Sequence, residues 1–232
     1  MSLFVPRRRP SREALDEGAL PSDEMRRSLQ DLALVNRSWG GSRTLERYLL
    51  PRLREAAAKS VRLLDVGAGS GDVSRRLARV LRKSGFDASV VAVDIQWRHL
   101  AAGRVMFPRQ PLPCAAADAF RLPFAPRSFD WIVSTLLFHH FSPEQNVSFL
   151  RELDRVARQG LALLDLRRHL VPLLFVRLAG AFVFESPVSI RDGVASVGQS
   201  YTPAEARAIL REVAPGFRVE RVFPFRLLIC RP

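Results

Sequence analysis

The chain has 232 residues, 47% of them apolar, and a formal net charge of +13. This length fits one large domain or one domain with a cap, and the apolar fraction excludes a disordered chain. No stretch reaches the roughly 20 apolar residues of a membrane span, and no apolar segment typical of a secretory signal follows the first arginines. Two cysteines, Cys114 and Cys230, make neither a disulfide framework nor a zinc site, so we expect a reduced, cytoplasmic protein without a metal site.

Arginine supplies almost all of the positive charge, because Lys59 and Lys83 are the only lysines. Apart from the cluster at residues 7–9 and some short pairs, the arginines are scattered along the chain. A nucleic-acid-binding protein gathers its basic residues on one face or stripe, so this composition argues against a nucleic-acid partner. Attraction to anionic membrane surfaces or acidic substrates is consistent with it.

The chain before the first strand divides into two parts. Residues 1–21 are rich in proline and arginine and predict a flexible basic arm. Residues 22–60 predict a helical cap of two helices, because apolar residues recur there at helical spacing. Ser22 is the expected N-cap of the first helix and Ser42 that of the second, in which Pro51 is expected to produce a kink.

A glycine-rich loop follows a buried strand and opens a helix. Residues 61–66 form an apolar run, Gly67, Gly69 and Gly71 alternate after it, and residues 73–81 have helical periodicity. Strand, glycine turn and helix begin a nucleotide-binding βαβ unit. The glycines let a ligand approach the backbone, and the helix points its free N–H groups at that ligand. A tight turn without a ligand is the alternative.

Carboxylates surround this loop. Asp65 precedes it and Asp72 follows it, which would repel a pyrophosphate and suits a ligand with a cationic amino group. Asp94 ends the next strand, residues 88–95, so a parallel sheet places its carboxylate beside the loop. A carboxylate in that place can accept hydrogen bonds from both hydroxyls of a ribose, although Asp94 would also serve as a cap for the following helix.

Further strands are expected at residues 114–117, 131–138, 160–166, 217–223 and 225–230, with helices between most of them. The connection at about residues 167–200 is too long for a simple crossover and predicts a partly helical, apolar lid. That lid would meet a lipophilic substrate or a membrane surface, or it would pack on the sheet.

Four features resemble the class I S-adenosylmethionine-dependent methyltransferases. The D-x-G-x-G-x-G stretch at residues 65–71 resembles their first motif, Asp94 their acidic second motif and residues 117–120 their third. The stretches 122–124 and 128–130, with the histidine pair after the fourth strand, look most like the quinone, phenol and polyketide methyltransferases. The resemblance covers the chain from about residue 61 onward.

The resemblance implies an α/β fold with a Rossmann-like, seven-stranded, mostly parallel sheet and a C-terminal antiparallel hairpin over residues 61–232. It implies S-adenosyl-L-methionine as the cofactor, with Asp118 taking the adenine amino group. In similar enzymes a segment like Asn36-Arg37 lies over the cofactor or the substrate, so Asn36 and Arg37 are candidate substrate-binding residues. Arg191 of the lid is a third candidate, with a solvated surface residue as the alternative. The candidate cofactor residues are Asp65, Gly67, Ala68, Gly69, Gly71, Asp94, Ile95, Asp118, Ala119 and Ser134.

The implied reaction is methyl transfer from a sulfonium to a nucleophile, for which a hydroxyl acceptor must lose its proton. His139 and His140 follow the fourth strand, where an imidazole can serve as the base, and we favour His140. Stacking on the cofactor or capping the next helix is the alternative for either histidine. Asp165 alone does not make the carboxylate cluster of a magnesium-dependent enzyme.

We therefore expect O-methylation, or C-methylation, of an aromatic, polyketide-like or quinone small molecule. An RNA or protein methyltransferase that uses the basic surface is one alternative, and a partner-dependent protein that retains only the fold is another. Residues 134–137 replace the Asn/Asp-Pro-Pro-aromatic motif of the nucleobase N-methyltransferases, which argues against a nucleic-acid substrate.

Overall fold

One mixed sheet of seven strands forms the centre of the protein. The computed structural model describes residues 4–232 and orders the strands β3-β2-β1-β4-β5-β7-β6. β7 is antiparallel to both of its neighbours and the other pairs are parallel. This arrangement confirms the predicted fold class. The strands are β1 (Ser60–Val66), β2 (Asp87–Asp94), β3 (Cys114–Ala116), β4 (Phe129–Thr135), β5 (Ala157–Leu166), β6 (Arg218–Val222) and β7 (Arg226–Arg231).

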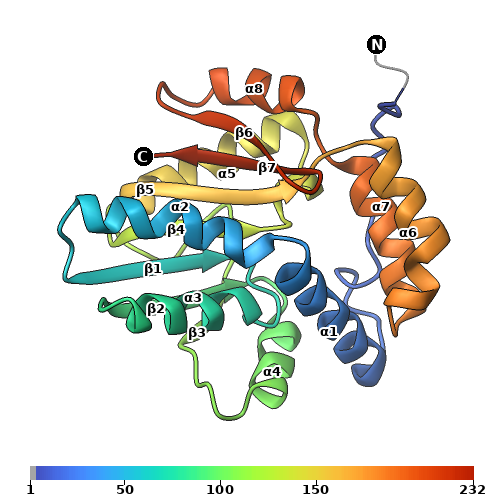
Figure 1. Cartoon of the computed structure of the whole chain (residues 1–232), viewed down its shortest axis with the longest axis horizontal. Coiled ribbons are helices and arrows are strands. Elements are labelled where there is room, and N and C mark those ends of the chain that lie inside the picture. The colour runs from blue at the N-terminus through green and yellow to red at the C-terminus, as the bar shows by residue number, and fades with distance from the viewer. Residues whose placement is uncertain (1–3) are drawn as a thin grey trace.

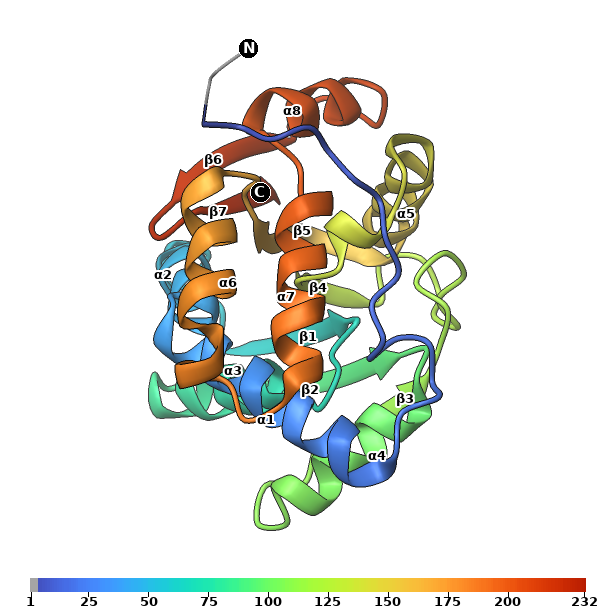
Figure 2. The same ribbon diagram turned by 90° about the vertical axis from the view of Figure 1, so that its right-hand side faces the viewer.

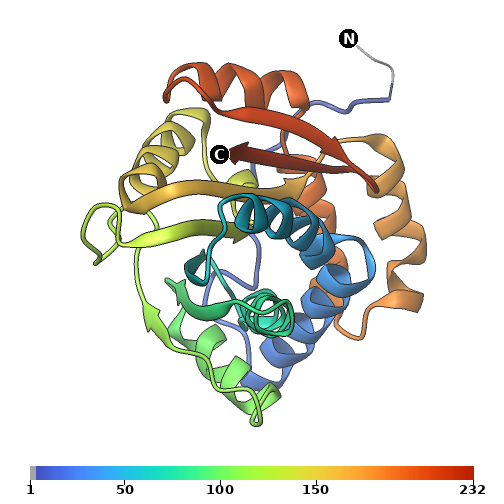
Figure 3. The same ribbon diagram turned by 60° about the vertical axis from the view of Figure 1, so that its left-hand side comes forward.

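Two cores cover the two faces of the sheet, because successive side chains of a strand point to opposite sides. Leu64 of β1 packs into one core and Leu63 into the other. The first core is closed by α5 (Pro143–Val156) and α8 (Pro203–Arg211), the second by α2 (Gly41–Glu55) and α3 (Asp72–Lys83). Figure 3 shows α8 and the β6–β7 pair at one edge of the sheet, with α4 (Trp97–Met106) at the other.

Two helix starts follow from their capping residues. The Ser142 hydroxyl accepts a hydrogen bond from the Gln145 amide while the Gln145 side chain accepts one from the Ser142 amide. Thr202 and Glu205 form the same box at α8. Each box satisfies two amides that a helix end would leave free, and a proline stands at the first position of both helices.

The cap and the lid lie together at the carboxyl ends of the strands. The cap helix α1 (Ser22–Ser38) stands beside the lid helices α6 (Leu170–Val183) and α7 (Pro187–Gln199), as Figure 1 shows. Figure 2 looks onto this end of the molecule, where the amino-terminal segment runs down beside α7 toward α4. None of the helices in residues 4–232 combines the length and the apolar character that crossing a bilayer requires.

The amino-terminal segment differs from the flexible arm that its composition predicts. Among residues 4–21, which the structure describes, Arg8 donates hydrogen bonds to the carbonyls of Gln199, His139 and Phe141. The amides of Ala14 and Leu15 donate to the carboxylate of Asp192 on α7. The segment is therefore held on the lid, by contacts with residues far away in the chain that local sequence patterns do not reveal. Residues 1–3 of the predicted arm lie outside the described residues.

Three predicted boundaries need correction. Neither Ser22 nor Ser42 caps its helix, because α1 and α2 begin at those residues or one earlier; Gly40, in a left-handed conformation, precedes α2. The strand predicted at residues 131–138 ends at Thr135, since Leu136 adopts a positive φ of 59° that an extended strand excludes. The chain then makes the short 3-10 turn η1 (Phe138–His140).

Candidate active site

A large cavity opens at the carboxyl ends of the strands, beneath the cap and the lid. Its volume is about 950 Å³, near the upper end of the range for small-molecule sites, and it has room for two ligands side by side. The glycine loop and the ends of β1 and β2 form a polar part of its wall. Apolar side chains of the cap, the lid and the β6–β7 turn form another part: Leu29, Leu32, Val35, Trp39, Phe175, Val176, Phe184, Phe223 and Phe225.

The glycine loop adopts the conformation that its sequence predicts. Gly67, Gly69 and Gly71 have φ angles of 71°, 55° and 72°, a region that side chains with a Cβ rarely adopt. A Cβ on Gly67 would also stand 2.6 Å from the side chain of Leu137. Gly71 lies at the start of α3 and ends the loop, so only Gly67 and Gly69 of the three line the cavity.

Asp94 joins the loop to the second strand. One of its oxygens accepts a hydrogen bond of 2.7 Å from the Gly69 amide, and the other accepts one of 2.8 Å from the Gln96 amide. Burial raises the pKa of Asp94, while these amides and the neighbouring His99 oppose that rise. Each oxygen keeps a lone pair for a further donor, as binding of a diol would require.

Asp65 presents a free acceptor at the base of the loop. Its Oδ2 accepts a hydrogen bond of 2.5 Å from the Ser74 hydroxyl, whereas its buried Oδ1 has no partner among the described residues. Burial raises the pKa of Asp65 to about 7, against the opposing effect of the Ser74 bond. A buried carboxylate oxygen without a donor costs free energy, which a cationic ligand would recover.

The other predicted residues divide into two groups. Ala68, Ile95, Asp118 and Ala119 line the cavity with the loop, and so does Asn36, whose side chain donates to Asp72. Ser134, Arg37 and Arg191 do not line it.

Periodicity explains the second group. Ser134 of β4 is buried and does not line the cavity, whereas the next residue, Thr135, does. Arg37 and Arg191 lie on the exposed sides of α1 and α7, because a residue adjacent to an inward-facing Asn36 or Asp192 points about 100° away around the helix. The positions of Arg37 and Arg191 therefore give no support to a role in substrate binding.

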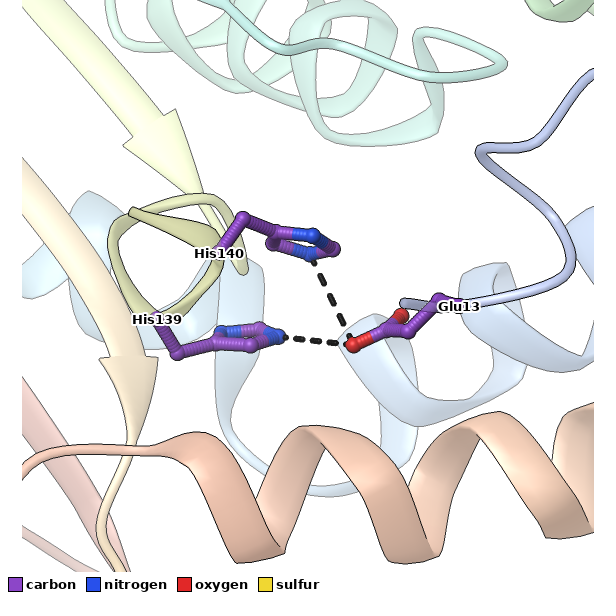
Figure 4. Close-up of side chains that lie close together, drawn as sticks. All are labelled: Glu13, His139 and His140. Atoms are coloured by element: carbon purple, nitrogen blue, oxygen red, sulfur yellow. Dashed lines mark hydrogen bonds and ion pairs between the residues drawn. The ribbon is translucent and has the colours of Figure 1, made fainter. Parts of the chain in front are cut away.

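His139 and His140 reach the cavity wall together, and Glu13 of the amino-terminal segment meets them there (Figure 4). Glu13 Oε1 lies 3.3 Å from His139 Nε2 and 3.7 Å from His140 Nε2. On the far side of each ring stands another carboxylate, Asp165 at 2.6 Å from His139 Nδ1 and Asp16 at 3.1 Å from His140 Nδ1. The two imidazoles are thus enclosed by three carboxylates.

These carboxylates set the charge of the buried pair. Burial alone would lower the pKa of His139, but the charge and hydrogen bond of Asp165, helped by Glu13, raise it to about 10. The same contacts lower the pKa of Asp165 and of Glu13, although burial opposes both changes. In the chain alone His139 is therefore protonated at neutral pH, and a cation cannot accept the proton of an acceptor.

Comparison with known proteins identifies the domain. Residues 63–160 match the family of the methyltransferase domain. The matched stretch, 98 of the 232 residues, is a methyltransferase domain. The chain is 36% identical over 101 residues to a demethylmenaquinone methyltransferase of Thermotoga maritima, a match that covers 42% of this chain and 39% of that protein. It is 38% identical over 110 residues to a malonyl-[acyl-carrier protein] O-methyltransferase of Halorhodospira halophila, covering 47% and 35%.

A solved structure supports the fold over a longer range. The SAM-dependent methyltransferase from Aquifex aeolicus superimposes with a TM-score of 0.61 and 19% identity, over 91% of this chain and 98% of that one. The matches to the two curated relatives span well under two thirds of those proteins. Residues 63–160 thus match a methyltransferase domain, as the motif at residues 65–71 predicts, and the solved structure shows the fold.

The residues around the cavity fit S-adenosylmethionine, the cofactor that the motif at residues 65–71 predicts. The unpartnered Asp65 Oδ1 suits its amino group, Asp94 suits its ribose hydroxyls, and Gly67 and Gly69 leave the backbone open to its approach. Asp118 lies on the same cavity wall, where its carboxylate accepts from the Phe120 amide. The predicted cofactor and the predicted motif are therefore consistent with this geometry.

Two further residues escaped sequence reasoning. Arg226 of β7 is buried and lines the cavity; its Nε donates to the Trp39 carbonyl, and its Nη1 has no partner among the described residues. Burial lowers the pKa of Arg226 to about 10 against the opposing charge of Asp165, which still leaves it charged at neutral pH. Its place in an alternating strand gives no signal of this role.

Gly103 of α4 is the second of these residues. A Cβ on it would stand 2.0 Å from the Ser70 carbonyl oxygen, so only glycine lets α4 pack against the cofactor loop.

Proposed function

We propose that the chain methylates a small-molecule acceptor with S-adenosylmethionine as the donor. One observation carries this proposal: the cofactor loop with Asp65 and Asp94, and the histidine pair with Glu13, lie on the wall of one cavity. When bound, S-adenosylmethionine supplies a methyl group that is attached to a positively charged sulfur. The methyl group passes to the acceptor, and the sulfur keeps the electron pair of the broken carbon–sulfur bond. The contribution of the chain is to hold and orient both reactants and to exclude water.

The acceptor occupies the part of the cavity between the histidines and the lid. Trp39 of the cap and Phe175 of the lid are in edge-to-face contact, with ring centroids 5.3 Å apart, and Phe225 lies on the same wall. Aromatic walls of this kind favour an aromatic or lipophilic acceptor, in line with the demethylmenaquinone named for one relative. The free Nη1 of Arg226 provides a donor for an acceptor oxygen.

His140, beside Glu13, activates the acceptor in this proposal, as the sequence favours. His140 is the more accessible of the two histidines, with 20% of its side chain exposed against 2% for His139. The acceptor atom is proposed to be oxygen, with carbon as the alternative that product analysis would reveal.

The lid is proposed to contact a membrane surface or to shield a lipophilic acceptor. Leu178 and Phe182 of α6 are 74% and 90% exposed, and Leu174 and Phe175 are 42% exposed. Exposed large apolar side chains on one short helix are typical of an interfacial surface. Sedimentation with anionic vesicles tests the contact: the chain should bind, a Leu178→Ser/Phe182→Ser variant should bind less, and equal binding would contradict it.

A product screen tests the function itself. The protein is incubated with S-adenosylmethionine and with phenols, quinols or polyketide-like hydroxyl compounds, and both S-adenosylhomocysteine and the methylated acceptor are measured by mass spectrometry. Stoichiometric formation of the two products with one acceptor class supports the proposal. Transfer to RNA or protein, with none to any small molecule, would contradict it.

A further inference from the structure

The contacts around the two histidines have the arrangement of a metal centre, which neither the sequence nor the comparisons indicate. We propose that Glu13, His139 and His140 bind one divalent transition-metal ion through one carboxylate oxygen and the two Nε2 atoms. The proposal rests on the separation of these atoms, on the groups behind each ligand, and on the charge of the cluster.

The three ligand atoms converge on one point. Glu13 Oε1 lies 3.3 Å from His139 Nε2 and 3.7 Å from His140 Nε2, and one potential ligand atom from each residue lies within 4.8 Å of the others. Ligand atoms that each stand about 2.1 Å from a tetrahedral zinc ion are about 3.4 Å apart. The spacing therefore matches a three-residue site after small adjustments of the side chains.

Each histidine presents its Nε2 to the site because its Nδ1 is occupied. His139 Nδ1 lies 2.6 Å from Asp165 Oδ1, and His140 Nδ1 lies 3.1 Å from Asp16 Oδ2. Histidines that bind metals almost always donate their second ring N–H to a carboxylate, a carbonyl or water, which fixes the tautomer and the ring orientation. A simple hydrogen bond between one histidine and Glu13 would not require this support on both rings.

Two donors of the lid also hold Glu13, at the same oxygen that faces the histidines. The Ser196 hydroxyl and the Gln199 side-chain amide donate to its Oε1 at 2.6 Å and 2.8 Å, and both come from α7 of the lid. On either side of Glu13 in the chain, the Ser11 amide donates to Gln199 and the Ala14 amide to Asp192. The amino-terminal segment is thus fixed at the position where it delivers the third ligand.

The charge of the cluster favours a cation. Three carboxylates, those of Glu13, Asp16 and Asp165, surround two imidazoles; His139 and Asp165 are buried, whereas 47% of the Asp16 side chain is exposed. Arg8 of the same segment donates to the carbonyls of Gln199, His139 and Phe141 rather than to these carboxylates. The charge of Arg226 acts on Asp165 alone among the three. A divalent ion between the Nε2 atoms would balance this charge where the low dielectric makes it expensive.

The donor set indicates the class of ion. Two imidazole nitrogens and one carboxylate suit zinc or ferrous iron, whereas magnesium and calcium prefer oxygen ligands alone. Three protein ligands leave at least one coordination position, and the cavity that all three residues line is the space available to it. Given the proposed function, an acceptor hydroxyl bound there would lose its proton to water more readily, which would activate its oxygen.

Metal binding can be measured without the cofactor or an acceptor. The full chain is stripped with a chelator and titrated calorimetrically with zinc chloride, alongside Glu13→Gln, His140→Gln and the matched control Glu17→Gln, whose glutamate is exposed in the same segment. We expect one zinc per chain, at least tenfold weaker binding in the first two variants, and unchanged binding in the control. Circular dichroism verifies that each variant is folded.

Two results would overturn the proposal: absence of stoichiometric zinc binding by the folded chain, or equal affinity in the Glu13 and His140 variants. A Co²⁺ titration of the unaltered chain provides a test that needs no variant. A visible spectrum of nitrogen and oxygen coordination is expected, and a thiolate charge-transfer band would place the ion at a cysteine instead. Titration of the stripped protein with S-adenosylmethionine separates the two proposals, because cofactor binding does not depend on the ion.

Discussion

Removal of the Asp94 carboxylate tests the cofactor site most sharply among the substitutions. In the structure this carboxylate is buried and already accepts hydrogen bonds from Gly69 and Gln96, so it holds the loop and faces the cavity at once. Each hydrogen bond from a ligand hydroxyl to a charged acceptor contributes about 1.5 to 3 kcal/mol. Two such bonds at the lower value give about 3 kcal/mol, or roughly a hundredfold in the dissociation constant.

We therefore expect Asp94→Ala to weaken binding of S-adenosylhomocysteine by roughly a hundredfold or more, as measured by isothermal titration calorimetry. Asp94→Asn keeps one acceptor oxygen and should lose about half of that free energy, or roughly tenfold in affinity. Asp87→Asn, at the exposed opposite end of β2, is the matched control and should bind like the original chain. A folded Asp94→Ala variant with unchanged affinity would refute the assignment of Asp94 to the cofactor.

Three further substitutions test separate parts of the site. Gly103→Ala should lower both the melting temperature and cofactor affinity, since its Cβ would stand 2.0 Å from the Ser70 carbonyl oxygen; Gly198→Ala, with no atom within 4 Å of its Cβ, should change neither. Burial raises the pKa of Asp65 to about 7, so its carboxyl group is neutral below that pH and ionised above it. The affinity for the cationic cofactor should therefore rise by about tenfold from about pH 6 to about pH 8. In Asp65→Asn, titration calorimetry at both pH values should show no such rise in affinity, apart from the change that comes from titration of the cofactor itself. His140→Ala should lower kcat in a steady-state assay far more than it changes cofactor affinity; a fully active variant would remove His140 from acceptor activation.

The sheet and the cofactor loop could be predicted because their signals are local. Apolar runs such as residues 61–66 identify buried strands, and alternating glycines identify the turn that follows. Asp65 and Asp94 stand at the ends of such strands, so the parallel topology alone brings them together. The boxes at Ser142 and Thr202 likewise depend on residues three apart.

The acceptor side could be predicted only in part, because contacts between distant segments build it. Glu13 lies 126 residues before His139, in a stretch whose composition predicts a flexible arm. The turn that presents both histidines begins at Leu136, whose positive φ is unusual for a leucine and is imposed by tertiary packing. Sequence reasoning therefore found the histidines and noted Asp165, but it missed Glu13 and Asp16.

Register within helices explains why Arg37 and Arg191 do not line the cavity. The pair Asn36-Arg37 was considered together, but adjacent residues of a helix point about 100° apart, and only Asn36 faces the cavity. Arg191 and Asp192 show the same division on α7, where Asp192 faces the amino-terminal segment. The buried Arg226 gave no signal because an arginine at a strand end is usually exposed.

Calorimetric titration of the purified chain with S-adenosylmethionine, and then with S-adenosylhomocysteine, tests the proposed function most directly. The geometry of Asp65, Asp94 and the glycine loop predicts one site per chain with a micromolar dissociation constant at moderate salt. A folded chain that binds neither compound would contradict the proposed methyl transfer and would favour a protein that keeps the fold and acts through a partner.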